Sequence, residues 1–268
     1  MSSLLIAVIL GIVEGVTEFL PISSTGHLIL VNQLVEFHGN FAHIFDVVIQ
    51  MGAILSVVVY FWRKLNPFSG YKNISEREET WDLWRKTLVA LVPALLIGAT
   101  LGKYVQKVLF NPLIVAMALI IGGIILVIIE RRQQVGIINS INELSYKNSL
   151  LIGLIQCLAM IPGTSRSAAT IIGAILLGAS RSTAAEFSFF LAIPTMAAAS
   201  AYSLLTVEAS LTCTQWQIIF TGFVVAFLVA WAVIAVFMKY IQNHDFKPFG
   251  YYRIILGIVV LGISMFTK

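Results

Sequence analysis

The stretch from Gly11 to His27 reads GIVEGVTEFLPISSTGH, and it decides how the rest of the chain is interpreted. It begins as an apolar segment but carries Glu14 and Glu18 four residues apart, which places both carboxylates on one face of a helix. At Pro21 it breaks into a turn rich in hydroxyl groups, and it ends on an imidazole. Because such groups are costly to bury in apolar surroundings, we expect this stretch to be a functional site held in place by the remaining chain.

The composition is that of a polytopic membrane protein. Of the 268 residues, 59% are hydrophobic and only 11% are charged, whereas a soluble domain has about 25% charged residues. The net charge of +4 comes without a basic block interleaved with aromatic residues, so we expect no nucleic-acid partner. Cys157 and Cys213 have no disulfide or metal spacing and are expected to fill the core. The first five residues contain no Lys or Arg, which argues against a cleavable signal.

The pattern of apolar segments predicts six transmembrane helices and two shorter helical pairs. A helix that crosses a bilayer needs about 20 mostly apolar residues, and six regions approach this length: 43–62, 87–102, 108–129, 186–207, 215–238 and 249–267. Four shorter stretches form two pairs around polar turns, 4–13 with 28–37 and 150–161 with 168–179. Each pair is typical of a re-entrant hairpin, which enters and leaves the membrane on one side.

The two hairpins also indicate an internal repeat. Gly11 and Glu14 precede a Pro-Ile-Ser-Ser-Thr turn, and Gly153 and Gln156 stand at the same spacing before Pro-Gly-Thr-Ser-Arg. The first repeat is expected over 1–130, with its hairpin at 4–37, and the second over 150–268, with its hairpin at 150–179; a cytoplasmic connector at 131–149 joins them. Because each repeat adds three crossings, the second is inverted relative to the first. The expected fold is therefore an all-α membrane protein with inverted-topology repeats.

Charge predicts the orientation of this fold. The loops 63–86 and 239–253 and the connector hold most of the basic residues, and Lys103, Lys107 and Lys268 are on the opposite side. The positive-inside rule makes the first group cytoplasmic and puts both termini outside. The first hairpin then opens outward and the second inward, and their tips meet near the middle of the membrane. We also expect the loop 67–86 to be solvated.

The second hairpin is a candidate oxyanion site. Its turn sets a single guanidinium, Arg166, among hydroxyl-bearing residues. Arginine suits phosphate, and the amides at the start of the following helix suit an anion. The alternative is that Arg166 only pairs with a buried acid such as Glu14 or Glu18. The candidate substrate-binding residues here are Gly163, Thr164, Ser165, Ser167 and Thr170.

The first hairpin holds the candidate acids, nucleophile and imidazole. Glu14 and Glu18 repel each other, so one is protonated, or Arg166 neutralises them, or Mg²⁺ or Ca²⁺ binds between them. A structural polar cluster is the plainer alternative. Ser24 near His27, with a carboxylate, is the general arrangement of an activated nucleophile, although His27 could be a satisfied core histidine.

Five further polar residues are weaker candidates. Ser23 and Thr25 are candidate substrate-binding hydroxyls in the turn. Asp46 and Gln50 lie four residues apart at the start of the next span, and Glu186 is the counterpart of Asp46. These acids either favour the helix start or support the site, and Gln50 is a candidate contact to substrate.

With these motifs in view, the whole chain resembles the integral-membrane undecaprenyl-diphosphatase family associated with bacitracin resistance. The resemblance rests on EGVTEFLPISSTGH, which ends at His27, and on PGTSRSAAT, which ends at Thr170. It implies hydrolysis of undecaprenyl diphosphate to undecaprenyl phosphate and inorganic phosphate, which recycles the lipid carrier for peptidoglycan. It further implies a divalent-metal cofactor, an active site open to the outer face of the bacterial cytoplasmic membrane, and a homodimer. The matching positions are Glu14, Glu18, Ser24, His27 and Arg166, with Glu14 and Glu18 as the metal-binding candidates.

Two other functions are compatible with parts of this sequence. A different membrane phosphatase superfamily requires an Arg-Pro element, which is missing from this chain. A polyprenyl-phosphate transporter or flippase would use inverted repeats and broken helices, but it needs no paired carboxylates beside Ser and His. We therefore expect a hydrolase in which Arg166, nearby amides and a cation hold the phosphates. Ser24 or a water molecule attacks the terminal phosphorus, with His27 as base or acid.

Overall fold

The computed structural model describes residues 2–37, 39–109, 111–132, 136–206 and 211–266. Within these ranges the regular elements are all helical, apart from one isolated bridge between Ile138 and Ala179. The helices are α1 (Ser3–Thr17), α2 (Ser24–Val35), α3 (Asn40–Tyr60), α4 (Trp62–Leu65), α5 (Ile74–Leu109), α6 (Pro112–Arg131), α7 (Tyr146–Gln156), α8 (Arg166–Leu176), α9 (Arg181–Thr206), α10 (Cys213–Ile241) and α11 (Lys247–Phe266), with 3-10 turns at Ile141–Glu143 and Cys157–Met160.

Six helices are long and apolar enough to cross a membrane, as predicted. They comprise Asn40–Tyr60, Ile74–Gly102, Pro112–Arg131, Arg181–Leu205, Cys213–Ile241 and Lys247–Ser264. Because their outward-facing side chains are largely apolar, with many Leu, Ile and Trp residues exposed, a bilayer is the environment that suits them. The protein is a multi-pass helical membrane protein.

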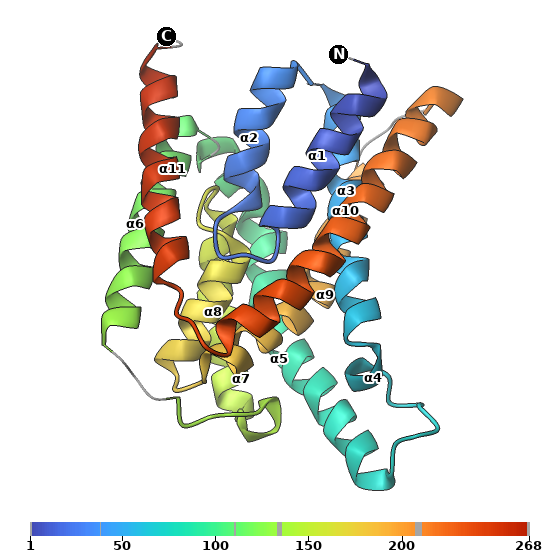
Figure 1. Ribbon diagram of the computed structural model, residues 1–268, viewed down its shortest axis with the longest axis vertical. Helices are drawn as coiled ribbons and strands as arrows, with labels where there is room; N and C mark the ends of the chain where they lie inside the picture. Colours follow the sequence, from blue (N-terminus) through green and yellow to red (C-terminus); the bar gives the residue numbers. More distant parts are fainter. Residues whose placement is uncertain (1, 38, 110, 133–135, 207–210, 267–268) are drawn as a thin grey trace.

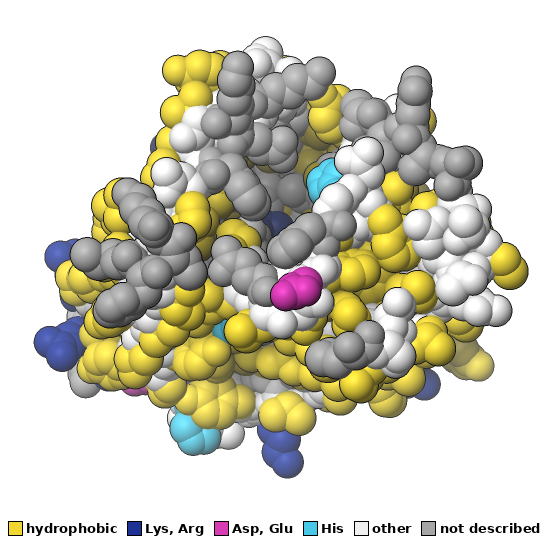
Figure 2. Space-filling model, turned by 90° about the horizontal axis from the view of Figure 1, so that it is seen from above, with side chains coloured by type: hydrophobic (Ala, Val, Ile, Leu, Met, Phe, Trp, Pro, Cys, Tyr) yellow, Lys and Arg dark blue, Asp and Glu magenta, His cyan; other side chains and the backbone are white. Residues whose placement is uncertain are grey.

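Four helices of intermediate length, α1, α2, α7 and α8, are too short to cross a bilayer alone. They contain 15, 12, 11 and 11 residues, which corresponds to about 16 to 23 Å against about 30 Å for the hydrocarbon core. α1 packs beside α2, and α7 beside α8. Figure 1 shows the turn between α1 and α2 roughly half-way along the molecule, and both termini at the same end. The described side chains on that end are mostly hydrophobic or uncharged (Figure 2).

Two features of the first half and one cysteine differ from expectation. The predicted solvated loop 67–86 is wrong from residue 74 onward, because α5 begins at Ile74. Asn73 and Glu76 cap this helix by exchanging hydrogen bonds of 2.8 and 2.9 Å between side chain and backbone N–H. Lys86, expected in solvent, is buried and donates to the carbonyls of residues 141 and 142. Cys213, expected in the core, is exposed at the start of α10.

Close helix packing fixes α1 against α10. A Cβ atom added to Gly11 would lie 2.8 Å from the carbonyl oxygen of Gly222, and one added to Gly15 would lie 2.8 Å from that of Ala226. Glycine at these two positions therefore lets the backbones approach, as small residues do in membrane helix pairs. This contact sets the rotation of α1, and with it the direction in which the carboxylates of Glu14 and Glu18 point.

The main hydrophobic core ties the end of α1 to the second half of the chain. Phe19 is fully buried and meets Phe189 of α9 edge-on, with ring centroids 5.2 Å apart. Phe189 in turn packs near Phe237 of α10. Aromatic pairs of this kind contribute about 0.5–1.5 kcal/mol beyond burial. They hold the turn that follows α1 against α8 and α9.

Candidate active site

Glu18 joins the two turns through its carboxylate. One oxygen accepts a hydrogen bond from the Ser24 hydroxyl at 2.7 Å, and the other lies 3.3 Å from Nη2 of Arg166. The Glu18 side chain is 4% exposed and that of Arg166 is 11% exposed. Arg166 also donates from Nη1 to the carbonyl of Ser188 at 2.9 Å. The carboxylate of Glu18 and the hydroxyl of Ser24 thus meet the guanidinium of Arg166, which lies 148 residues from Glu18 in the sequence. All three groups meet in a largely buried site.

Two side chains in this cluster have hydrogen-bonding atoms without a partner in the described chain. Glu14 is fully buried, and neither of its carboxylate oxygens accepts a hydrogen bond from any described residue. The Nε of Arg166 is likewise buried without an acceptor in the described chain. Leaving buried polar groups unpaired costs about 1–3 kcal/mol each, and more for charged groups. Unused acceptors on one acid and an unused donor on the arginine are what a site for a cation and an anion requires.

Asp46 adds a third carboxylate to this region. It lies on α3, close enough to act electrostatically on Glu14. One of its oxygens accepts from the side-chain amide of Asn32 at 3.1 Å, while its other oxygen and the amide oxygen of Asn32 have no donor in the described residues. The buried acceptors around Glu14 therefore outnumber the donors.

His27 is held by groups other than Ser24. Its Nδ1 lies 2.8 Å from the carbonyl of Ser23, and its Nε2 lies 2.7 Å from the hydroxyl of Tyr252 on α11. If Nδ1 carries the proton and donates to the carbonyl, Nε2 accepts from the tyrosine. The expected contact between Ser24 and His27 is thus replaced by a contact between Ser24 and Glu18. Tyr252 is a site residue that the sequence did not reveal, because 225 residues separate it from His27.

The two turns end in the same way. Ser23 and Ser165 have positive φ angles of 73° and 70°, and each precedes a helix. The hydroxyl of Ser23 accepts from the amide of Gly26, and that of Ser165 accepts from the amide of Ala168. These serines cap α2 and α8, whose first amides have no partner within the helix. Each helix start is therefore able to receive an anion.

Hydroxyl groups fasten the second turn to its neighbours. Ser167 donates to the carbonyl of Leu20 at 2.9 Å, which links the two turns directly. Thr170 is fully buried and its hydroxyl lies 2.6 Å from that of Ser188. Both residues thus support the turn from inside, and neither presents a hydroxyl that is free of protein contacts.

Comparison with known proteins shows the family of this chain. The family model described as "Bacitracin resistance protein BacA" matches residues 7–259. Undecaprenyl-diphosphatase 1 of Clostridioides difficile is 54% identical over 257 residues, which cover 95% of this chain and 94% of that protein. The undecaprenyl-diphosphatase of Limosilactobacillus fermentum is 50% identical over 268 residues, with 97% of each chain covered. The chain belongs to the BacA family.

Some of the predicted site residues of this BacA-family chain lie at the edge of the cluster. Thr25 is exposed on the first turn of α2. Gly163 has a φ of +92° and its backbone lies close to Val115, and Thr164 follows it in the turn. Gln50 lies one helical turn beyond Asp46 on α3, and no described hydrogen bond joins it to the cluster. The contact of Gln50 with substrate therefore stays a prediction.

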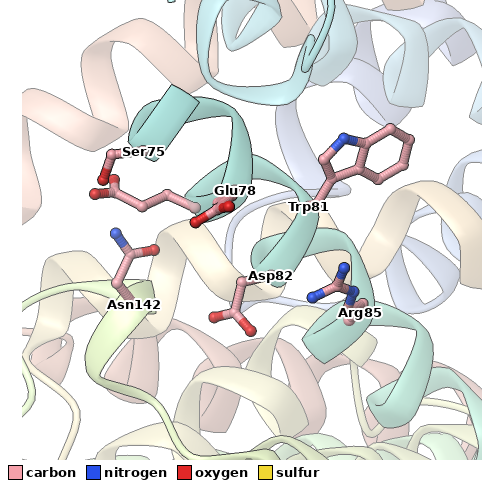
Figure 3. Close-up of a pocket in the computed structure, with 7 residues that line it drawn as sticks. Ser75, Glu78, Trp81, Asp82, Arg85 and Asn142 are labelled. Carbon is pink, nitrogen blue, oxygen red and sulfur yellow. The ribbon is translucent and has the colours of Figure 1, made fainter. Parts of the chain in front are cut away.

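Two cavities lie away from this cluster. One, of about 360 Å³, lies between the start of α5 and the connector. It is lined by Ser75, Glu78, Glu79, Trp81, Asp82, Arg85 and Asn142, most of which Figure 3 labels. Its acid Asp82 is already paired with Lys86 at 2.6 Å. The other, of about 570 Å³, lies beside the Glu130–Arg181 ion pair. Neither contains a residue of the two turns.

A divalent cation fits the chemistry of Glu14. Both of its carboxylate oxygens lack donors in the described chain, so a hard cation is a suitable partner. Within the described ranges no group of three or more His, Cys, Asp or Glu side chains is placed to hold a metal.

Proposed function

We propose that this chain hydrolyses undecaprenyl diphosphate to undecaprenyl phosphate and inorganic phosphate, and so recycles a lipid carrier for cell-wall synthesis. The undecaprenyl-diphosphatases to which it is 46–54% identical over nearly their whole length support this reaction. The observation that carries it is the meeting of Ser24, Glu18 and Arg166 from two turns, with a buried guanidinium nitrogen left free. A phosphate group is the ligand that this set of groups fits best.

The reaction breaks the bond between the bridging oxygen and the terminal phosphorus. Either a water molecule forms the new bond to that phosphorus directly, or Ser24 Oγ forms it first and water then cleaves the serine phosphoester to release inorganic phosphate. Glu18 accepts the proton of Ser24, since the hydroxyl already donates to its carboxylate at 2.7 Å. Arg166 and the amides at the start of α8 offset the charge that develops on the phosphate oxygens, which is the main catalytic contribution in phosphoryl transfer. When His27 is protonated, its Nε2 donates to Tyr252, and the tyrosine hydroxyl can give its own proton to the bridging oxygen of the departing undecaprenyl phosphate.

Glu14 and Glu18 are proposed to hold Mg²⁺ or Ca²⁺. Such a cation neutralises phosphate oxygens when it is bound. The support is the pair of unpartnered oxygens on Glu14, which lies one helical turn from Glu18. Removing the cation with a chelator should therefore abolish phosphate release, and adding Mg²⁺ should restore it.

Two re-entrant hairpins and an inverted repeat are the architecture proposed for this site. Several contacts support it. α1 packs on α10 of the second half, and its counterpart α7 packs on α5 of the first half. The serines that end both turns share one backbone conformation. In this arrangement each half supplies one turn, and the two turns meet between the outer spans.

The site is proposed to open toward the outer face of the bacterial cytoplasmic membrane, with both termini outside. Basic residues at the end opposite the termini, among them Arg63, Arg131 and Lys239, support this orientation through the positive-inside rule. Buried Lys86 and Arg253 no longer count toward it. A homodimer is also expected, on the resemblance to the family, and light scattering of the detergent-solubilised protein tests it.

Phosphate release from undecaprenyl diphosphate by purified protein in detergent tests the function. We expect release by the wild type, and loss of release in Arg166→Ala with the fold retained. Arg181→Gln is the matched control, because Arg181 also pairs with a buried glutamate but lies away from the two turns. Detergent micelles have no two compartments, so phosphate release there is evidence for a hydrolase and not for a transporter. Near-normal turnover by Arg166→Ala would refute the assignment.

A further inference from the structure

Arg253 is a fully buried arginine that holds both turns at once. It lies on α11 and is 0% exposed. Its Nη1 donates to the carbonyl of Pro21 in the first turn at 3.3 Å. Its Nη2 donates to the carbonyls of Gly163 and Thr164 in the second turn at 3.3 and 2.8 Å. Nε and Nη2 also donate to two carbonyls of α6, those of residues 119 and 118.

The charge of this arginine has no acidic partner in the described chain. All the ion pairs described there involve other basic residues. Burying an unpaired charge is expensive unless hydrogen bonds or a counter-charge offset the cost. Here backbone carbonyls offset part of it, since all three guanidinium nitrogens donate to them. A negatively charged ligand bound beside the turns would supply the missing counter-charge.

The contact with Thr164 determines where a backbone amide points. In a trans peptide the carbonyl and the following N–H are directed oppositely, and the described chain has no cis peptide bond. Because the carbonyl of Thr164 points at Arg253, the N–H of Ser165 points away from Arg253. This N–H has no hydrogen-bond acceptor in the described residues. It lies next to Arg166, in the turn where the phosphate is proposed to bind.

We propose that Arg253 is a positioning residue. Its hydrogen bonds hold the two turns together and orient the N–H of Ser165 toward the phosphate of the substrate. The proposal rests on the proposed phosphatase function and deepens it. In it the positive charge of Arg253 also acts on the bound phosphate through the turn, at a distance of one peptide group. Catalysis then depends on α11 as well as on both turns.

The residues packed around the side chain of Arg253 leave space for a planar guanidinium. A Cβ atom added to Gly122 of α6 would lie 2.3 Å from Nη2 of Arg253 and 2.9 Å from its central carbon. Glycine at this position leaves the space that the planar group fills. A lysine at 253 keeps the charge but has a single nitrogen, which cannot reach the carbonyls of Pro21, of Thr164 and of α6 together.

Two substitutions test the proposal from different directions. Arg253→Lys retains the charge and removes the fork, and Gly122→Ala pushes the guanidinium without deleting it. For each we measure kcat and KM for undecaprenyl diphosphate, inhibition by orthovanadate, and thermal unfolding of the monodisperse protein. We expect kcat to fall at least about tenfold, less than the ~10²–10³-fold seen when a donor to a reacting oxyanion is removed outright. The inhibition constant of orthovanadate should rise by a similar factor, while KM should change little, because we expect the prenyl chain to supply most of the binding of the substrate.

Gly262→Ala is the matched control for the glycine variant. It makes the same helical Gly-to-Ala change, but its added Cβ would meet nothing within 4 Å. It should leave kcat and vanadate inhibition unchanged. If Arg253→Lys and Gly122→Ala lower only the unfolding temperature, and the folded fraction keeps wild-type kcat and vanadate inhibition, Arg253 is merely structural and the proposal is overturned. If the wild type itself releases no phosphate, the proposed function fails instead.

Discussion

Replacing Glu18 with glutamine probes the centre of the proposed mechanism. The amide keeps the size of the side chain and can still accept from Ser24, but it loses the charge that pairs with Arg166. A hydrogen bond to a charged group is worth about 1.5–3 kcal/mol. If that amount is lost from the transition state, kcat falls by about 10- to 160-fold. Loss of a metal ligand would add to this figure.

Stability must be separated from catalysis in this experiment. Removing one partner of a buried ion pair leaves the other charge unpaired and costs about 3–5 kcal/mol. Glu130→Gln is a close control, since Glu130 is 3% exposed and pairs with Arg181 at 2.6 Å, far along the chain from both turns. We expect both variants to unfold at lower temperature, but only Glu18→Gln to lose turnover per folded molecule.

Phosphate release and thermal unfolding of the purified variants provide the measurement. The reasoning is refuted if Glu18→Gln retains kcat within about threefold of the wild type, a change of under 1 kcal/mol. It is also refuted if Glu130→Gln loses as much turnover as Glu18→Gln, because general destabilisation would then explain both. A double-mutant cycle with Arg166→Gln should give a coupling of about 1 kcal/mol or more between the two residues.

Three further predictions follow from the same contacts. Glu14→Gln should raise the Mg²⁺ concentration needed for half-maximal activity at least about tenfold, since one ligand is worth about 1.4 kcal/mol or more; an unchanged Mg²⁺ titration would contradict the role of Glu14. Tyr252→Phe removes the hydroxyl 2.7 Å from His27 and should lower kcat by about 2- to 13-fold, the worth of a neutral hydrogen bond; unaltered kcat would exclude the proton transfer from Tyr252. Burial alone would raise the pKa of Asp245, but hydrogen bonds from the side chain and amide of Lys247 hold that pKa below its usual value. Its stabilising effect is therefore present above the usual aspartate pKa of about 3.9 and is lost as the pH falls below it, so Asp245→Asn should lower the unfolding temperature at pH 7 and have a smaller effect at pH 3.

The spans were predictable because apolar length is a local property. Six segments close to 20 residues correspond to six candidate spans, with ends that differ by several residues. The helical start of α5 is hard to predict, because its many charged residues suggest a loop. The opposing signal is weak: only a few residues, such as Leu83 and Thr87, are buried, and their spacing is that of one helix face. The local sequence pattern thus predicts the existence of the apolar helices well. It predicts poorly where a helix begins when its first turns are charged.

The contents of the candidate site were predictable only in part. Polar groups in apolar segments are conspicuous, so Glu14, Glu18 and Arg166 stood out in the sequence. The partner of Ser24 and the support of His27 did not, because single-sequence spacing carries no information on contacts across 225 residues. Arg253 was counted with the basic loop residues. Its place inside an apolar span was the available signal, since a lone intramembrane arginine is rarely without function.

The balance of charge around the two turns bears on the proposal that both turns are needed for the site. The first hairpin and α3 bring three carboxylates, Glu14, Glu18 and Asp46, and a diphosphate would be repelled by them. Arg166 and Arg253 contribute two guanidiniums, one from the second hairpin and one from α11. Only with all three carboxylates ionised do these five groups sum to a charge of −1 before the substrate arrives. The proposed divalent cation would reverse that sign. The proposed dependence of phosphate release on Mg²⁺ or Ca²⁺ should therefore weaken when Asp46 is replaced by asparagine, which removes one of the repelling charges.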